Sequence, residues 1–327
     1  MTKLLLALAV LVALGSHASA EQITLGVSKN TVSPAILLAH GRGYFAEEGL
    51  ESKLTTMVAG AEEIAVAVAS GAFDFGGAGI SGGLFNLASQ VHIIAGGIHE
   101  SAGFQGLVMV AGPHAFDDGV RTYRDLAHIK SFAVTQVGGP THYALILAAA
   151  KFGFDLGQVR IVPLQNPANE LAALTGGQVD ATAPPTSATA AAIAKGNVKL
   201  LGYVGDETPF QFGVAFASAK MLERRDTVER FLRAYKKAAR AFHDAFTGPD
   251  GARRDGPDAQ EILALLAKEL GLGIDDVKLG IPYIDPEARL DVADVRRQLD
   301  WFKTQGMVKP GITADAIIDA RYVVPMP

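Results

Sequence analysis

Short β-branched segments alternate along the chain with longer segments whose apolar residues recur at helical spacing. In the N-terminal third, the expected strands are residues 23–27, 54–58, 73–75, 91–95 and 106–110. Helices are expected between them, starting near Pro34, at residues 62–70 and from about Ser81, with the proline at a first helical turn. This alternation is typical of α/β domains with mostly parallel sheets.

The pattern restarts with its own elements between about residues 114 and 211. The expected strands are residues 131–135, 159–164, 179–181 and 198–203, and the expected helices are residues 141–152, 167–174 and 186–194. Residues 212–217 then form a strand that carries the chain back to the first unit. The remaining sequence is mostly helical, at residues 227–246, 259–270 and 292–305.

Two crossings between α/β units predict a hinge, and a hinge predicts a ligand cleft between two lobes. We expect residues 21–112 and 212–327 to form a discontinuous lobe 1 and residues 113–211 to form lobe 2. The first 20 residues precede both lobes. They contain Lys3, an apolar run over residues 4–14 and the small residues Ala18-Ser19-Ala20, the pattern of a cleaved signal peptide. The sequence therefore predicts export to the periplasm.

The composition narrows the function classes. The chain has 327 residues, 49% hydrophobic and 19% charged, with a net charge of −5 and no cysteine. The absence of cysteine excludes disulfides, thiolate nucleophiles and cysteine-ligated metals. The densest basic segment, residues 224–240, alternates with apolar residues at helical spacing and indicates the solvated face of a helix, although docking to a membrane or partner remains open. No nucleic-acid partner is expected.

Catalytic motifs are weak. The histidines lack metal-ligand spacing, and no glycine-rich segment ends as a nucleotide-binding loop does. Residues 79–83, Gly-Ile-Ser-Gly-Gly, come nearest to a nucleophile elbow but break its pattern by one place. We therefore expect a binding protein and not an enzyme, with no cofactor and no metal.

Several motifs carry a family resemblance. Residues 43–50 read Gly-Tyr-Phe-Ala-Glu-Glu-Gly-Leu, residues 67–71 read Ala-Val-Ala-Ser-Gly, and residues 177–181 read Gly-Gln-Val-Asp-Ala. With Pro34-Ala35-Ile36, residues 139–147 and residues 171–174, they resemble the sulfonate, nitrate, taurine and thiamine-pyrimidine binding proteins of ABC importers. The resemblance covers essentially the whole chain after residue 20.

This resemblance implies a type II periplasmic binding protein fold, with two α/β lobes and a helical C-terminal extension that completes lobe 1. It also implies a monomer that delivers a small organic anion of the sulfonate, nitrate or carboxylate type to a membrane permease and its ATPase. Two alternatives stay open: the solute is a thiamine-related pyrimidine or another aromatic compound, or the loaded protein docks on a sensory receptor. A secreted hydrolase is a third, weaker alternative.

The binding site is expected where the strands end, because ligands of open parallel sheets bind outside the carboxyl ends of the strands. These loops are residues 28–35, 58–61, 76–82, 135–142, 165–169 and 183–187; several open into helix starts, which favour anions, and they contain almost no lysine or arginine. The predicted ligand-binding residues are Ser33, Pro34, Gly60, Gly79, Ser81, Gln136, Gly139, Thr141, His142, Asn166, Pro185 and Thr186.

Some of these residues have a second interpretation. The hydroxyls of Ser33, Ser81, Thr141 and Thr186 either cap their helices or bind the solute. His142 either contacts the solute or orients its loop. We expect Phe210 and Phe212 to pack in the core or hinge, and Trp301, the only tryptophan, to pack within the C-terminal region.

Overall fold

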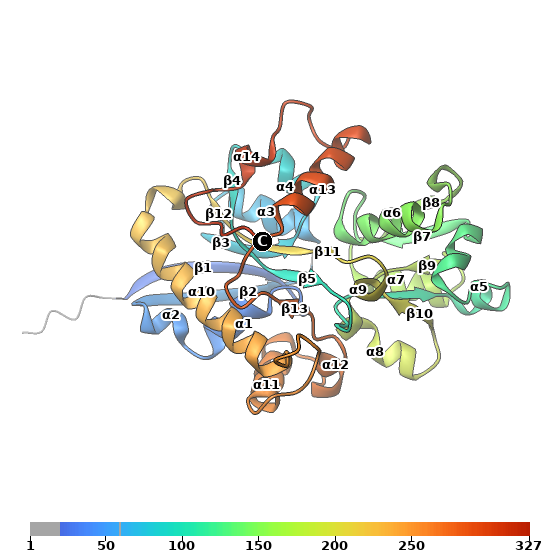
Figure 1. The fold of residues 1–327 in the computed structure, drawn as a ribbon, viewed down its shortest axis with the longest axis horizontal. Coiled ribbons are helices and arrows are strands. Elements are labelled where there is room, and N and C mark those ends of the chain that lie inside the picture. Colours follow the sequence, from blue (N-terminus) through green and yellow to red (C-terminus); the bar gives the residue numbers. More distant parts are fainter. Residues whose placement is uncertain (1–19, 59) are drawn as a thin grey trace, which may run out of the picture.

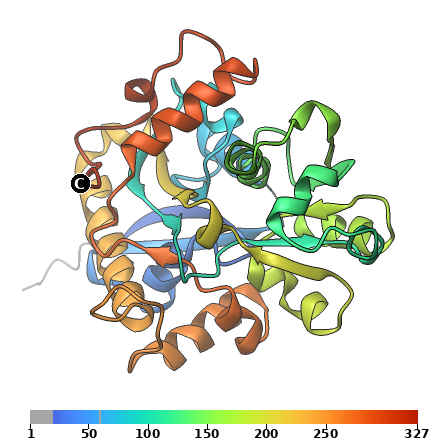
Figure 2. The ribbon, with the colours of Figure 1, turned by 45° about the vertical axis from the view of Figure 1, so that its right-hand side comes forward.

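A computed structural model describes residues 20–58 and 60–327. Within these residues the strands form two five-stranded sheets and one three-stranded sheet. Figure 1 shows the two larger sheets in separate lobes joined at the middle, and Figure 2 shows them with the lobe 2 side turned forward. The predicted α/β fold with two lobes is confirmed. The predicted signal peptide lies outside the described residues except for Ala20.

Lobe 1 is built on a mixed sheet of order β2-β1-β3-β12-β4. Its strands are β1 (Glu21–Ser28), β2 (Leu50–Met57), β3 (Phe75–Gly79), β4 (Val91–Gly96) and β12 (Gly213–Ser218). Strands β1, β2 and β3 are parallel, whereas β12 runs antiparallel to β3 and β4, with Gly213 opposite Gly79. Because β12 arrives from lobe 2, it starts at the edge of the sheet where β3 ends.

Both faces of this sheet are buried. The first four helices are α1 (Pro34–Gly41), α2 (Tyr44–Glu47), α3 (Ala61–Ala69) and α4 (Gly82–Asn86). Along β12, Ala215 and Ala217 pack into the core cluster with α1, while Val214 and Phe216 pack into the cluster with α3 and α4. Strands covered on both faces are apolar at every position, which explains why they appear in the sequence as continuous apolar runs.

Most of the C-terminal extension packs on lobe 1, while α12 (Ile274–Leu279) also reaches α8 (Thr186–Ala194) of lobe 2. Its helices are α10 (Arg225–Phe246), α11 (Ala259–Leu270), α12 (Ile274–Leu279), α13 (Val292–Thr304) and α14 (Ala314–Ile317). On α10, Phe231 is stacked against Phe45 and Phe75, with ring centroids 5.3 and 3.9 Å away. The basic side chains of α10 pair with carboxylates of lobe 1, such as Arg233 with Glu48.

Lobe 2 repeats the architecture with the sheet order β10-β6-β9-β7-β8. Its strands are β6 (Val108–Ala111), β7 (Ser131–Val134), β8 (Arg160–Pro163), β9 (Ala181–Thr182) and β10 (Lys199–Tyr203). Its helices are α5 (Pro113–Asp117), α6 (Pro140–Phe152), α7 (Pro167–Thr175), α8 (Thr186–Ala194) and α9 (Val204–Glu207). Short 3-10 helices occupy residues 123–128 and 156–158 in this lobe and residues 221–223 in lobe 1.

A small sheet joins the lobes. It consists of β5 (Ile98–Glu100) between β11 (Phe210–Gln211) and β13 (Tyr283–Ile284), all antiparallel. The predicted division placed β6 in lobe 1, but β6 pairs with β9 and β10 in the sheet of lobe 2. The outward crossing therefore lies before Val108. The prediction was wrong because the sequence of an apolar strand such as β6 does not indicate which of two sheets it joins.

Candidate functional site

The six predicted loops meet between the lobes. They surround a narrow cavity of about 40 Å³. The lining residues are Ser28, Asn30, Val32, Gly60, Ala61 and Gly79 from lobe 1, Thr135, Pro140, Thr141, Pro167 and Pro185 from lobe 2, and Phe212 from the return crossing. Each of the six loops supplies at least one of these residues, as the position of strand ends in α/β sheets predicts.

The lobes touch each other around this cavity. The Gly82 N–H donates to the Gly138 carbonyl at 2.9 Å, and the Glu62 N–H donates to Gln136 Oε1 at 3.3 Å. A Cβ built on Gly79 would lie 2.3 Å from Cγ of Pro140, so the two lobes approach this closely only with a glycine at position 79. This geometry is that of a closed pair of lobes.

The electrostatic character of the cavity comes from the backbone. Its lining residues are all uncharged. The starts of α3, α6 and α7 contribute Ala61, Pro140 and Pro167, and Pro185 precedes the first residue of α8. The first N–H groups of a helix have no partner within it and carry a partial positive charge. Four such helix starts at one cavity favour an anionic group without a lysine or arginine clamp.

Two threonine hydroxyls add hydrogen-bonding capacity. Thr141 lines the cavity, and Thr186 directly follows the lining residue Pro185. Their side chains are 3% and 2% exposed, and neither Oγ1 atom has a hydrogen-bond partner among the described residues. A buried hydroxyl without a partner costs about 1–3 kcal/mol. Neither hydroxyl caps its helix, so neither proton is committed to a partner among the described residues.

A cationic side chain, Lys29, lies in a recess beside the cavity. An adjoining recess of about 140 Å³ shares Asn30 and Pro167 with the cavity and is also lined by Lys29, Val58 and Asn166. Lys29 is exposed. A cation in this recess attracts anions toward the cavity without being one of the cavity's own lining residues.

The structure separates the predicted site residues into groups. Those that line the cavity are Gly60, Gly79, Thr141 and Pro185. Ser33, Pro34, Gly139 and Thr186 stand at the starts of α1, α6 and α8, next to the lining residues. Ser33 is buried without capping α1, and its side chain packs against the backbone of Gly77. Their places agree with the predicted loops, although contact with a solute stays a prediction.

Other predicted residues use their polar atoms elsewhere. Ser81 Oγ accepts from the Leu84 N–H at 3.1 Å, and Asn166 Oδ1 accepts from the Asn169 N–H at 3.0 Å. Both residues therefore cap their helices. Capping therefore occupies the hydroxyl oxygen of Ser81, the serine of the segment that came nearest to a nucleophile elbow in the sequence. Gln136 bridges the lobes through Glu62.

His142 orients its loop. Its Nδ1 accepts from the Gly138 N–H at 3.1 Å, and its ring meets Trp301 edge to face with centroids 5.6 Å apart. Burial lowers the pKa of His142 to about 4, because the charged imidazolium is poorly solvated there. The ring is therefore neutral at pH 7, with its proton on Nε2. Trp301 packs on lobe 2 as well as on its own region, since it also contacts Tyr143.

Several lining residues were not predicted individually. Asn30, Pro140 and Pro167 lie in the predicted loops, but a loop sequence does not indicate which side chain faces inward. Phe212 both packs in the core, where it is 4% exposed, and walls the cavity. Phe210 packs against Tyr143, as hinge packing predicts.

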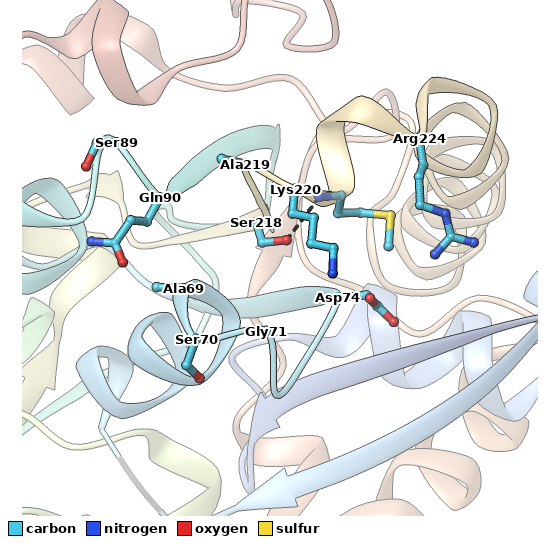
Figure 3. Close-up of a pocket in the computed structure, with 11 residues that line it drawn as sticks. Ala69, Ser70, Gly71, Asp74, Ser89, Gln90, Ser218, Ala219, Lys220 and Arg224 are labelled. Atoms are coloured by element: carbon cyan, nitrogen blue, oxygen red, sulfur yellow. Dashed lines mark hydrogen bonds between the residues drawn. The ribbon is translucent and has the colours of Figure 1, made fainter.

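A second recess of about 410 Å³ lies at the far end of lobe 1 (Figure 3). Its polar groups secure the ends of strands: Asp74 Oδ2 accepts from the Thr24 N–H at 2.8 Å, and Ser218 Oγ accepts from the Met221 N–H at 3.1 Å. Its lining comes from lobe 1 alone. This recess therefore has a structural explanation and lacks the shared lobe contacts of the cavity.

Within residues 20–58 and 60–327, no three histidine or carboxylate side chains are grouped closely enough to hold a metal ion. Over the same part of the chain, no helix combines the length and apolarity that crossing a membrane requires.

Solved structures share this fold. The alkanesulfonate-binding protein SsuA from Xanthomonas axonopodis pv. citri bound to MOPS is 19% identical, with a TM-score of 0.71 over 92% of this chain and 99% of that chain. The periplasmic nitrate-binding protein NrtA from Synechocystis PCC 6803 is 15% identical, with a TM-score of 0.67 over 90% and 84%. A mutant of DszB in complex with biphenyl-2-sulfinic acid is 14% identical, with a TM-score of 0.59 over 94% and 97%.

A match to a protein family identifies a chain more narrowly than a shared fold does. No curated protein matches the sequence of this chain. The family model described as NMT1/THI5 like matches residues 30–252. These residues include both crossings between the lobes and all six cavity loops, apart from residues 28 and 29 of the first loop. The matched part is more than half of the chain, and the chain therefore belongs to the NMT1/THI5-like family.

Proposed function

We propose that this protein is the periplasmic solute-binding component of an ABC importer, which holds a small organic anion of the sulfonate, nitrate or carboxylate type between its lobes. It works as a monomer and passes the solute to a permease and ATPase in the inner membrane. The observation that carries the proposal is the pair of buried hydroxyls of Thr141 and Thr186, which have no partner among the described residues, beside a cavity whose described lining is uncharged and includes helix starts.

The chemistry of the cavity favours an anion. Threonine hydroxyls are donors, and the partial positive charge at helix starts suits the oxygens of a sulfonate, nitrate or carboxylate. Phe212, Val32 and the three lining prolines provide apolar surface for a short organic group. The names of two similar structures, an alkanesulfonate-binding and a nitrate-binding protein, support the same ligand class.

Closure of the lobes supplies the affinity. A micromolar dissociation constant requires about 8 kcal/mol, more than a few hydrogen bonds provide at a wet surface. Contacts such as Gly79 with Pro140 exclude water and strengthen each polar interaction with the solute. Because the solute touches both lobes, it shifts the population toward the closed form that a permease recognises.

The alternatives have less support. A pyrimidine would favour an aromatic pair and an acidic partner. Of the lining residues that the structure describes, Phe212 alone is aromatic and none is acidic. Hydrolysis would need a nucleophile with a base, and among the described residues the lining contains no histidine, aspartate or glutamate. A receptor in place of a permease would use the same cavity, and binding of the purified protein to each partner would distinguish the two.

A binding panel tests the proposal. Methanesulfonate, nitrate, acetate, benzoate and a thiamine-type pyrimidine are titrated calorimetrically into the full protein. We expect an anion to bind, and we expect Thr141→Val and Thr186→Val each to weaken its binding about tenfold, since each loses one hydrogen bond to a charged group. Thr189→Val is the matched control, because Thr189 Oγ1 already donates to the Pro185 carbonyl at 2.9 Å. Binding of the pyrimidine alone, or anion binding unaffected by both variants, contradicts the proposal.

A further inference from the structure

A buried polar cluster joins three distant parts of the chain at the edge of the cavity. Thr31 follows the end of β1 in lobe 1, Ser187 lies in the first turn of α8 in lobe 2, and Gly280 follows α12 in the C-terminal extension. Thr31 Oγ1 lies 3.1 Å from Ser187 Oγ and donates to the Gly280 carbonyl at 3.0 Å. Thr31 and Ser187 are 2% and 3% exposed. Asn30 and Val32, on either side of Thr31, and Pro185, two residues before Ser187, line the cavity.

The direction of these hydrogen bonds follows from the number of protons. A threonine hydroxyl has one hydrogen, and that of Thr31 is directed to the Gly280 carbonyl, which can only accept. The bond between the two hydroxyls must therefore run from Ser187 to Thr31. This bond crosses from lobe 2 to lobe 1, so separation of the lobes breaks it.

Backbone packing supports the same junction. Helix α12 packs against α8, and Figure 1 shows the two helices side by side below the crossing. A Cβ built on Gly280 would lie 2.5 Å from the Ser187 backbone nitrogen, so α8 approaches this closely only with a glycine at position 280. Next to it, the Ile281 carbonyl accepts from the Gln105 N–H of the outward crossing at 3.3 Å. One short segment thus contacts lobe 1, lobe 2 and the crossing between them.

We propose that Thr31, Ser187 and Gly280 form an interlobe latch that stabilises the closed form and thereby sets how long a solute stays bound. Thr31 and Ser187 are positioning residues, because they act on the closure of the lobes and need not touch the solute. When the lobes separate, the bond between Ser187 and Thr31 is broken and the Ser187 hydroxyl becomes hydrated, so loss of this bond affects the closed form selectively. The inference depends on the proposed function only for its effect on a solute.

The first test needs no solute. The natural chain has no cysteine, so Thr31→Cys with Ser187→Cys introduces a single pair. With oxidised glutathione, we expect a disulfide within the chain, detected by mass spectrometry, because the replaced oxygens lie 3.1 Å apart when the lobes close. Ser89→Cys with Ser187→Cys is the control, since the exposed Ser89 lies on the far recess of lobe 1. If the latch pair remains reduced, or if both pairs oxidise equally fast, the latch is refuted.

The second test measures the effect on a solute. Thr31→Val keeps the shape of the side chain but leaves Ser187 and the Gly280 carbonyl without their partner. We expect the affinity for methanesulfonate to fall roughly 5- to 15-fold, mostly through faster dissociation, with the melting temperature of the solute-free protein little changed. Gly280→Ala, which brings a methyl group against α8, should act in the same direction, and Thr189→Val should leave the dissociation rate unchanged.

The outcomes of the two tests are separable. Unchanged dissociation rates in both Thr31→Val and Gly280→Ala overturn the latch while leaving the proposed function intact. If methanesulfonate fails to bind the unaltered protein, the proposed ligand class is wrong, and the disulfide experiment alone decides whether the latch exists.

Discussion

Replacement of His142 by asparagine should change how the stability of the protein depends on pH. His142 is 6% exposed, accepts a hydrogen bond from the Gly138 N–H through Nδ1 and packs on Trp301. Burial lowers its pKa from 6.5 to about 4. Between these two pH values the unfolded chain binds a proton at this position and the folded protein does not.

The sign follows from this difference in proton binding. Stability rises with pH wherever the unfolded state binds more protons, so the contribution of neutral His142 is fully present above pH 6.5 and decreases as the pH falls to about 4. A pKa difference of this size corresponds to about 3 kcal/mol. Asparagine does not titrate. We therefore expect the free energy of unfolding of the unaltered protein to fall by about 3 kcal/mol relative to His142→Asn between pH 7 and pH 4.

The assay is urea denaturation at several pH values, followed by the emission of the single tryptophan, Trp301. The difference between the two proteins isolates His142, because other titrating groups are common to both. Burial raises the pKa of Glu100 to about 7 and that of Glu170 to about 8, and these groups act in the opposite direction in both proteins. His128→Asn, at an exposed position, is the matched control for the exchange of a histidine for asparagine. Parallel stability curves for His142→Asn and the unaltered protein would refute the reasoning.

Two further predictions concern the cores of the lobes. Glu170→Gln should be more stable than the unaltered protein by about 2–5 kcal/mol at pH 8 and about equal to it at pH 4, because the raised pKa of Glu170 makes its carboxylate form costly as the pH rises from 4.5 to about 8. Urea midpoints measure this difference, and lower stability of the variant at pH 8 would contradict the prediction. Phe231→Ala should lower the free energy of unfolding by about 3–5 kcal/mol, since it removes the ring between Phe45 and Phe75. Thermal denaturation measures this loss, and a loss below about 1 kcal/mol would contradict the prediction.

The regular elements were largely predictable because their signals are local. The predicted helix at residues 259–270 matches α11, which ends at Gly271 in the left-handed conformation that glycine adopts readily. The long amphipathic pattern of α10 also fixes one buried face from the sequence alone. The two- and three-residue strands β5, β11 and β13 were missed, because such short segments have no periodicity and form only when distant parts of the chain meet.

The candidate site, too, has features that were predictable from the sequence and features that were not. The sequence alone determined which six loops surround the cavity, because strand ends and helix starts follow from local patterns. Tertiary structure decided what each side chain does: Ser81 and Asn166 find local N–H partners, whereas Thr141 and Thr186 have none among the described residues.

The junction of the lobes was decided by tertiary structure alone. The sheet that β6 joins, the contact of Trp301 with lobe 2 and the meeting of Thr31 with Ser187 each join residues far apart in the sequence. The physical reason is that hydrophobic periodicity encodes which face of an element is buried but not which partner covers it. The partner is fixed only when the two lobes and the C-terminal extension pack together.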